Sequence, residues 1–259
     1  MALGEETSLR PPGPSLIRWE IFAVFAVSLG ASALNALLHL VAALLAAQPL
    51  ASQETQLVGS LAPGRPWLDL TLQLASVAET LAPVLLVLYL MARSGEAPSV
   101  IGLDASQPVR DLGRGALLAA VVGGAGLGLY LAAFHLGLSL NVVAEALPAV
   151  WWRVPVLLLN AIQNGLLEEI LVIGYLLRRL DQLGWSPAGA IAASALLRGS
   201  YHLYQGFGAF IGNAAMGVIF ALLYRRWGRV MPLVVAHALI DAVAFIGYAF
   251  LNGKVSWLP

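Results

Sequence analysis

The chain has 259 residues, of which 59% are hydrophobic and only 11% are charged, whereas about 25% of the residues in a soluble domain are charged. Together with a mean hydropathy of +0.82, this shortfall predicts an integral membrane protein. A formal net charge of zero argues against a nucleic-acid partner, which would require a basic face. The absence of cysteine excludes disulfide and thiolate chemistry.

The chain begins with a polar segment, residues 1–18, that contains several prolines. This segment has no small-residue cleavage site, so we expect no removable signal peptide and interpret the first apolar run as an uncleaved anchor. Residues 19–259 are predicted to form a single membrane domain.

Long apolar runs follow this segment, and polar turns separate them. A helix needs about 20 apolar residues to cross a hydrocarbon core of about 30 Å, and helices satisfy their own backbone hydrogen bonds in lipid. We therefore predict an all-α, polytopic transmembrane helix bundle with about seven spans, an eighth span or a half-span being the alternatives. The predicted spans are 19–47, 68–92, 112–137, 154–177, 187–204, 207–224 and 230–251.

Two of these spans have unusual features. The third, "LGRGALLAAVVGGAGLGLY", is rich in glycine, which we attribute to close helix packing because no strand precedes it to form a phosphate loop. The fifth has about 18 residues, or about 27 Å, so the turn "YQGFG" at 204–208 is expected to lie within the bilayer and to bring His202 inward. Gly206 and Gly208 would permit that tight reversal.

The cationic residues are distributed unequally between the two ends of the spans. A cytoplasmic N-terminus places ten arginines on the cytoplasmic side and three cations outside, which favours this orientation. The arginine-rich composition with a single lysine is typical of a GC-rich bacterial genome, so we expect a multi-pass protein of a bacterial cell membrane. The cytoplasmic set is Arg10, Arg18, Arg93, Arg110, Arg114, Arg178, Arg179, Arg225, Arg226 and Arg229; the outer set is Arg65, Arg153 and Lys254.

Nine ionisable side chains lie well inside the predicted spans, where a charge is costly and usually marks a functional site. Three of them, His39, Glu79 and His135, stand alone and are interpreted as interfacial residues or as residues that bond a backbone carbonyl. The other six belong to three spans in the C-terminal half and are Glu168, Glu169, Arg198, His202, His237 and Asp241.

The spacing of these six residues favours one common cluster. Arg198 and His202 are four residues apart, as are His237 and Asp241, so each pair shares one helical face. The two adjacent glutamates lie about 100° apart around their helix, so one can face a reacting atom while its neighbour holds a partner side chain. A bundle interior could gather all three pairs. The alternative is a structural ion-pair network that locks the helices together.

A cluster of carboxylates and imidazoles is suited to hydrolysis. A carboxylate beside a neutral imidazole can take a proton from water and deliver it to a leaving group, and a second imidazole can stabilise the oxyanion that forms at a carbonyl. The sequence indicates no serine or cysteine nucleophile, because cysteine is absent and Ser200 lacks the nucleophile-elbow motif. The residues therefore favour hydrolysis of an amide by an activated water inside a membrane.

Three motifs carry a resemblance to a known family: "EEILVIG" at 168–174, "RGSYH" at 198–202 and "HALID" at 237–241. Residues 150–250 resemble the CAAX protease and bacteriocin-processing family (CPBP, also called ABI), which contains type II CAAX prenyl endopeptidase-like intramembrane glutamate proteases. The first half of the chain matches only as apolar spans.

The resemblance implies a role for each matched residue. Glu168 would be the base that activates water, with help from His202. Glu169 would orient the surrounding side chains, and His237 would supply the contact to the oxyanion. These roles are what the family implies; the spacing alone does not assign them.

Three positions depart from the family pattern. Ile173 stands where the family has arginine, Arg198 where it has phenylalanine, and Asp241 where it has asparagine. One hypothesis covers the first two departures: the cation has moved from the fourth span to the fifth, where Arg198 can neutralise Glu169 or Asp241. An ionised Asp241 cannot donate to an oxyanion as an asparagine amide can, so it is protonated, or it orients His237, or the oxyanion role has moved.

Several functional alternatives stay open. We expect no cofactor, but a zinc ion held by His202, His237 and a carboxylate (Glu168 or Asp241) is an alternative, disfavoured by the absence of an HExxH arrangement. The expected partners are a membrane-embedded or membrane-proximal peptide and the lipid bilayer. A non-enzymatic immunity or scaffold protein of the same fold is a second hypothesis. A proton-coupled transporter is a third, although no inverted repeat is found.

Overall fold

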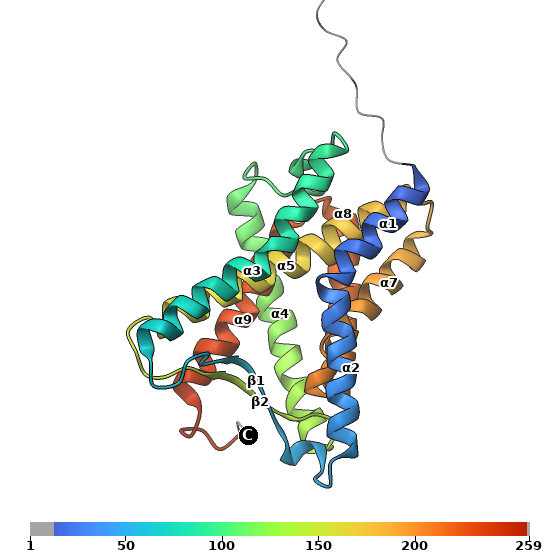
Figure 1. The fold of residues 1–259 in the computed structure, drawn as a ribbon. Coiled ribbons are helices and arrows are strands. Elements are labelled where there is room, and N and C mark those ends of the chain that lie inside the picture. Colours follow the sequence, from blue (N-terminus) through green and yellow to red (C-terminus); the bar gives the residue numbers. More distant parts are fainter. Residues whose placement is uncertain (1–12, 258–259) are drawn as a thin grey trace, which may run out of the picture.

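The computed structural model describes residues 13–257, so Arg10 and most of the predicted polar segment 1–18 lie outside the described residues. The chain is a bundle of long helices, as predicted from the sequence (Figure 1). The α-helices are α1 (Pro14–Ala26), α2 (Leu29–Leu45), α3 (Pro66–Arg93), α4 (Pro108–His135), α5 (Arg153–Glu168), α6 (Leu176–Gln182), α7 (Pro187–Ser200), α8 (Phe207–Trp227) and α9 (Met231–Leu251). The other elements are the 3-10 turns η1 (Leu50–Ser52), η2 (Pro98–Ile101) and η4 (Leu203–Gln205), the π-helical segment η3 (Glu169–Tyr175), and the strands β1 (Glu54–Gly59) and β2 (Asn141–Ala146).

Helix length and composition identify a multi-pass membrane protein. Within the described residues, five helical segments are long and apolar enough to cross a membrane, and the bent pair α1–α2 makes a sixth if both helices form one span. Each of the seven predicted spans corresponds to a helical segment, but α7 has only 14 residues. At 1.5 Å per residue it rises about 21 Å, less than the hydrocarbon core of about 30 Å. The predicted fifth span is therefore too short to cross the core as a helix by itself. The turn that follows it completes the path to the far end of α4, where Gly206 pairs with Ser139.

A small parallel sheet, which the sequence did not predict, joins two of the interhelical connections. β1 connects α2 to α3, β2 connects α4 to α5, and the strands pair in the register Glu54↔Asn141 to Gly59↔Ala146 (Figure 1). Just before β2, Ser139 forms an antiparallel bridge with Gly206. The sheet is therefore tied to the turn between α7 and α8.

The larger of two hydrophobic cores surrounds η3. All seven residues of this segment are buried, and α1, α3, α7, α8 and α9 contribute side chains to the same core. The second core lies between β2, α5 and α9. The C-terminal half of the chain thus has a protein-lined interior in which polar groups can be sheltered from lipid.

The glycines of the third predicted span are only partly explained by helix packing. A Cβ added to Gly115 would lie 2.5 Å from the Val235 side chain, so α4 and α9 require glycine at this contact. Three later glycines of α4 have no neighbouring atom within 4 Å of an added Cβ, and nothing in the structure explains them: Gly124, Gly126 and Gly128.

Arginine side chains tie the helix ends together on one side of the bundle. Arg179 of α6 is fully buried and donates to Glu20 of α1 at 2.8 Å and to Glu96, beyond α3, at 2.5 Å. These contacts hold α1, α3 and α6 in fixed relative positions where η3 ends.

A second arginine holds the ends of α4 and α9. Arg229 donates to the carboxylates of Asp104, at 3.0 Å, and Asp111, at 2.6 Å. Hydrogen bonds from Ser106, followed by those from Arg229, hold the pKa of Asp104 at about 2. The interhelical loops on this side are therefore linked by ion pairs.

Candidate functional site

The two adjacent glutamates lie where α5 changes into a π-helix. Glu168 ends α5, and the wider turn of η3 begins at Glu169. Glu168 is 8% exposed and Glu169 is fully buried. Short π-helical segments inside α-helices are frequently found at functional sites. The change of helix type here occurs within the sequence motif itself.

The two carboxylates have different partners. Glu168 accepts a hydrogen bond from the Tyr201 hydroxyl at 2.7 Å. Glu169 accepts one from Arg198 at 2.7 Å and contacts Nδ1 of His237 at 2.7 Å. One glutamate therefore holds a cation and an imidazole in place, while the other faces a tyrosine.

Arg198 occupies the centre of the cluster. Its side chain is fully buried, its Nη2 donates to Glu169, and its Nη1 lies 3.7 Å from Glu168. The guanidinium also lies over the Phe220 ring, 5.5 Å from the centroid. Of the two partners that the sequence hypothesis offered, Arg198 contacts Glu169; among the described contacts it has none with Asp241. Ile173 is buried in the larger apolar core.

His237 is held between two carboxylates. Its Nδ1 contacts Glu169, and its Nε2 lies 3.8 Å from Asp241 Oδ1. Since a carboxylate accepts, Nδ1 carries the proton that it donates to Glu169, and Nε2 is turned toward Asp241. Asp241 in turn accepts a hydrogen bond from Asn164 at 2.8 Å.

Asn164 is the residue of this site that the sequence reasoning missed. It precedes Glu168 by four residues, so the two side chains share one face of α5. The available signal was an amide inside an apolar run at that spacing, but a neutral amide marks a buried site less clearly than an ionisable side chain does. Gly165 brings this face close to α9, because a Cβ there would lie 2.9 Å from the Val234 carbonyl oxygen.

His202 lies just beyond the end of α7. Its Nδ1 donates to the Arg198 carbonyl at 2.9 Å, which leaves Nε2 as an acceptor in the neutral ring. Its ring is stacked at a tilt on Tyr201, with the centroids 4.7 Å apart. Tyr201 contacts both Glu168 and the His202 ring, and Arg198 lies 3.7 Å from Glu168 and bonds the Glu169 carboxylate that contacts His237. The three side chains that the sequence predicted to converge therefore lie in one cluster.

The predicted reversal at "YQGFG" positions His202. Gly206 has φ +105°, and a Cβ there would lie 2.7 Å from Ser139 Cα, so both backbone conformation and space require glycine. At Gly208 an added Cβ would lie 2.4 Å from the Ala133 side chain. The turn is thus fitted against the segment that leads into β2. Tyr204 and Gln205 bond each other at 2.9 Å within it.

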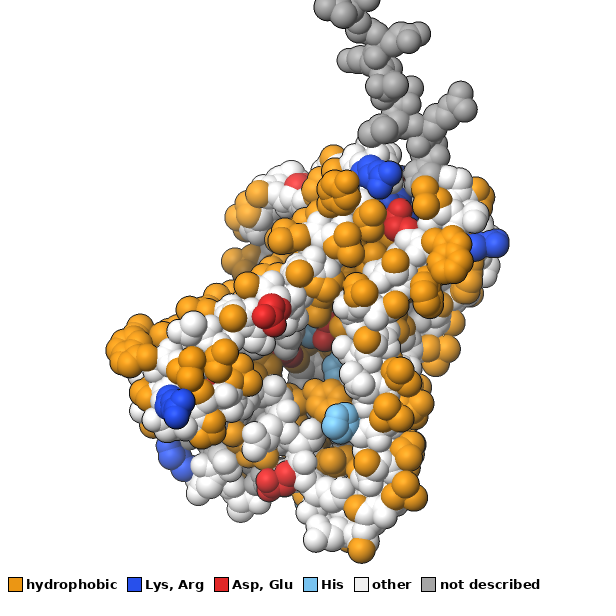
Figure 2. Space-filling view, in the orientation of Figure 1, with side chains coloured by type: hydrophobic (Ala, Val, Ile, Leu, Met, Phe, Trp, Pro, Cys, Tyr) orange, Lys and Arg blue, Asp and Glu red, His pale blue; other side chains and the backbone are white. Residues whose placement is uncertain are grey.

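The three solitary residues lie outside the cluster. His39 on α2, Glu79 on α3 and His135 at the end of α4 are all exposed. His135 packs edge-on against Phe134 at 5.7 Å. The space-filling view shows a hollow between α2 and α3, with acidic and histidine side chains visible inside it (Figure 2).

The zinc alternative involves His202, His237 and a carboxylate. Within residues 13–257, no group of three or more His, Cys, Asp or Glu side chains is arranged to hold a metal ion. A requirement for metal stays a hypothesis, which activity measurements with a chelator test.

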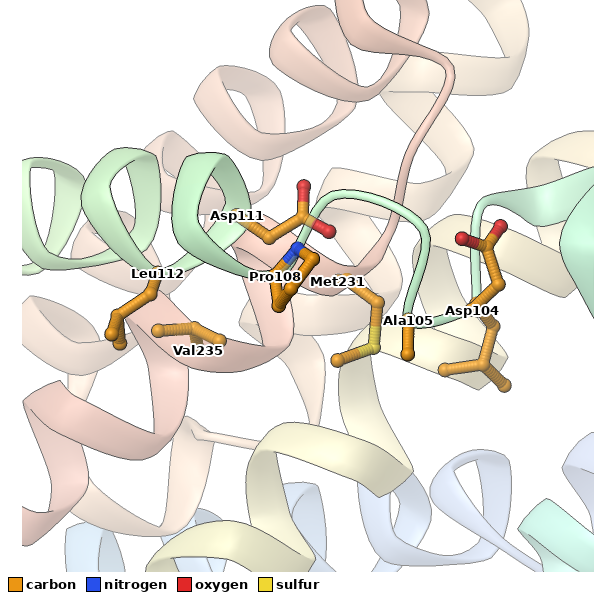
Figure 3. Close-up of a pocket in the computed structure, with 8 residues that line it drawn as sticks. Asp104, Ala105, Pro108, Asp111, Leu112, Met231 and Val235 are labelled. Carbon is orange, nitrogen blue, oxygen red and sulfur yellow. The ribbon is translucent and has the colours of Figure 1, made fainter.

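A separate pocket of about 290 Å³ lies at the start of α4 and α9 (Figure 3). Its lining is mainly apolar, with Leu112, Met231 and Val235 on one side, and it includes the Asp104 and Asp111 carboxylates. Both carboxylates already bond Arg229. This pocket therefore belongs to the ion-paired loops at the start of α4 and α9 and not to the buried polar cluster.

The fold and the site define a class: a polytopic helical membrane protein with a buried centre of carboxylates, imidazoles and a guanidinium, contributed by α5 with η3, by α7 with the turn after it, and by α9. Residues 149–243 match the family model described as type II CAAX prenyl endopeptidase Rce1-like. The resemblance inferred from the motifs is thereby confirmed for this part of the chain, which contains every residue of the cluster. Comparison with curated proteins and with solved structures gives no match.

Proposed function

We propose that this protein is an intramembrane endopeptidase of the CAAX-protease type, which hydrolyses a peptide bond with a water activated by Glu168 and His202. The family match over residues 149–243 supports a protease. The observation that carries the proposal is the buried cluster in which Tyr201 joins Glu168 to His202 and Glu169 joins Arg198 to His237.

In the proposed reaction, the water is held between Glu168 and Nε2 of His202. Its oxygen attacks the scissile carbonyl carbon while its proton passes to the Glu168 carboxylate. Glu168 then gives that proton to the leaving nitrogen, the C–N bond breaks, and a carboxylic acid and an amine are released. The Tyr201 hydroxyl, which donates to Glu168 at 2.7 Å, holds the carboxylate in position for both steps.

His237 is the proposed contact for the developing oxyanion. Because its Nδ1 donates to Glu169, Nε2 can donate to an oxyanion only when the ring is protonated. Glu169 and Asp241 flank the ring and would balance that positive charge. Asp241 accepts from Asn164, so its proposed role is to position His237.

Glu169 and Arg198 are positioning residues in this scheme. The bond from Arg198 to Glu169 fixes the carboxylate that in turn fixes His237. Arg198 would thus take the place of the arginine that the family has at position 173.

The proposed setting is a bacterial cell membrane with the N-terminus in the cytoplasm. The substrate would be a peptide within the bilayer or next to it. The orientation is supported by the excess of arginine at one end of the spans. A tag-accessibility assay on intact cells would test it: a C-terminal tag should be accessible from outside without permeabilisation, and a tag accessible only after permeabilisation would contradict it.

Turnover of a membrane-anchored reporter peptide in proteoliposomes tests the enzymatic proposal. Glu168→Gln and His202→Ala should each lower kcat by at least about 100-fold, since general acid–base catalysis contributes about 10²–10⁴. Arg226→Gln, at an exposed side chain on α8, is the matched control and should cleave normally. Addition of a chelator tests the zinc alternative. If a correctly folded parent cleaves nothing, the non-enzymatic scaffold hypothesis is favoured.

A further inference from the structure

The hollow between α2 and α3 has an unusual lining for a membrane protein. A pocket of about 330 Å³ opens there, lined from the α1–α2 junction, from α2 and α3, and by Leu167. Its walls combine apolar and polar groups, the polar ones being Ser28, Ser32, Asn35, Glu79 and Thr80. Leu167, the residue before Glu168 on α5, lines the pocket as well, so the pocket lies next to the helix that carries the two glutamates. The hollow is visible in Figure 2.

Polar side chains continue along the α2 side of this gap. Ser28, Ser32, Asn35 and His39 are spaced by four, three and four residues, which places them on one helical face. Asn35 and His39 are exposed. On an ordinary lipid-facing helix this stripe would be apolar, so it indicates a face that does not meet lipid chains.

Glu79 gives the same indication from the α3 side. It lies 13 residues from the start and 14 residues from the end of α3, or about 20 Å from either end. It is exposed, and within residues 13–257 it has no hydrogen bond or ion pair. A carboxylate at the middle of a span costs several kcal/mol in lipid, which a water-filled opening would avoid.

The backbones of both flanking spans are interrupted at this pocket. Pro83 lies inside α3 and lines the pocket. Because proline has no N–H, the carbonyl of Glu79 loses its helical partner. On the other side, α1 and α2 meet at a 49° bend beside Ser28. Irregular backbone at membrane depth is tolerated where it lines a cavity, and here two interruptions line the same one.

β1 lies in the connection from α2 to α3, and among residues 13–257 only one of its edges is paired, with β2. Asn141 N donates to Gln53 O, so the odd-numbered residues of β1 bond β2 in the parallel register. The backbone groups of Glu54, Gln56 and Val58 then point away from β2. Such an edge is a template for the addition of another extended segment.

We propose that the gap between α2 and α3 is a lateral entrance for a polypeptide, and that the substrate is a membrane-inserted segment admitted in an extended conformation. An extended chain carries unpaired backbone N–H and C=O groups, which a wall with a free carbonyl, hydroxyls, an amide and a carboxylate can satisfy. A hydrocarbon chain has no such groups and would leave these walls unsatisfied. This inference rests on the proposed peptidase function, whose substrate class it names.

The first experiment uses the absence of cysteine from the chain. Glu79→Cys and the matched control Leu85→Cys, a 67% exposed residue on the same helix, are treated in proteoliposomes with a water-soluble thiol reagent applied to both faces. The thiolate is the nucleophile that attacks such reagents, and it forms in water and not in lipid. Glu79→Cys should react at least about tenfold faster than Leu85→Cys. Equal reaction rates for the two variants would overturn the proposal that the gap is a water-filled entrance.

The second experiment closes the entrance reversibly. Asn35→Cys and Thr80→Cys, both in the pocket wall, are combined in one variant. A short bifunctional thiol-reactive cross-linker that contains a cleavable disulfide then joins the two cysteines across the gap. Cleavage of a membrane-anchored peptide by the joined variant should fall at least about tenfold relative to the same variant before joining, and it should return after reduction. For each single variant, the same reagent should change the rate by much less, relative to that variant before treatment. Undiminished cleavage by the joined variant would overturn the entrance and leave the peptidase proposal intact. Absence of cleavage in the parent itself would overturn both.

Discussion

Removal of the central cation should be among the most damaging single changes in this protein. Arg198→Met keeps an unbranched, apolar chain of similar length but removes the cation from Glu169 and leaves His237 as the partner of this buried carboxylate; both side chains of the ion pair are fully buried in the parent. Removing one partner of a buried ion pair costs about 3–5 kcal/mol, so the apparent Tm should fall by roughly 6–20 °C. The assay is thermal unfolding of the purified protein in detergent, monitored by intrinsic tryptophan fluorescence.

A double-mutant cycle separates loss of the pair from loss of packing. In Arg198→Met/Glu169→Gln no carboxylate is stranded, so on the order of 2 kcal/mol should be recovered relative to the sum of the single changes. Activity should not return, because the Glu169 contact to His237 is changed as well. Arg225→Met provides the control: its pair with Asp181 is solvent-exposed and should contribute less than about 1 kcal/mol. If Arg198→Met costs no more than that control, the relocated-cation hypothesis is wrong.

Three further predictions concern other parts of the molecule. Asn164→Asp should abolish activity, because it places one carboxylate against another in the pair with Asp241. The exchange variant Asn164→Asp/Asp241→Asn should restore a measurable kcat. An exchange variant as inactive as the single change would contradict the pairing of these two side chains. Gly206→Ala should destabilise the fold by more than about 2 kcal/mol in denaturant unfolding, because its φ is positive and other atoms occupy the space of an added Cβ. Gly64→Ala is the control: its φ is also positive but the space is open, so it should cost about 1 kcal/mol. Equal costs for the two variants would refute the close approach of Gly206 to its neighbours. The pKa of Asp104 in the folded protein is about 2, below the ordinary 3.8. Its contribution to stability is therefore complete above about pH 4 and is lost as the pH falls toward 2. Asp104→Asn should flatten that part of the curve of Tm against pH, and an unchanged curve would contradict the prediction.

Periodicity and spacing sufficed to predict the parts of the site that are local in sequence. A separation of four residues on a helix fixes two side chains to one face whatever surrounds them, which is why Arg198 with His202 and His237 with Asp241 could be paired from the sequence. The shortness of the fifth span and the glycine at 206 likewise pointed to a submerged turn. Both properties depend only on helix geometry and backbone sterics.

The parts that escaped prediction depend on contacts between distant segments. The two strands, at 54–59 and 141–146, pair across about 90 residues of intervening chain, and each taken alone is a short connection between helices. The π-helical turn at Glu169 is stabilised by complete burial, since its wider backbone has no distinct sequence pattern. Glu79 seemed isolated because its relation to the α1–α2 bend arises only when both spans pack around Leu167.

The site also shows which properties of a buried polar centre are constrained. Two adjacent carboxylates inside a helical bundle require a cation within reach, but the helix that supplies it is free to vary: Arg198 reaches Glu169 from α7, while Ile173 fills the apolar core. The same reasoning applies to the amide. Asp241 stands at the family's asparagine position, and an amide from Asn164 on the adjacent helix bonds it directly. The first departure thus becomes an exchange between neighbouring helices that keeps a cation beside Glu169, and the second leaves Asp241 with an amide partner on the adjacent helix.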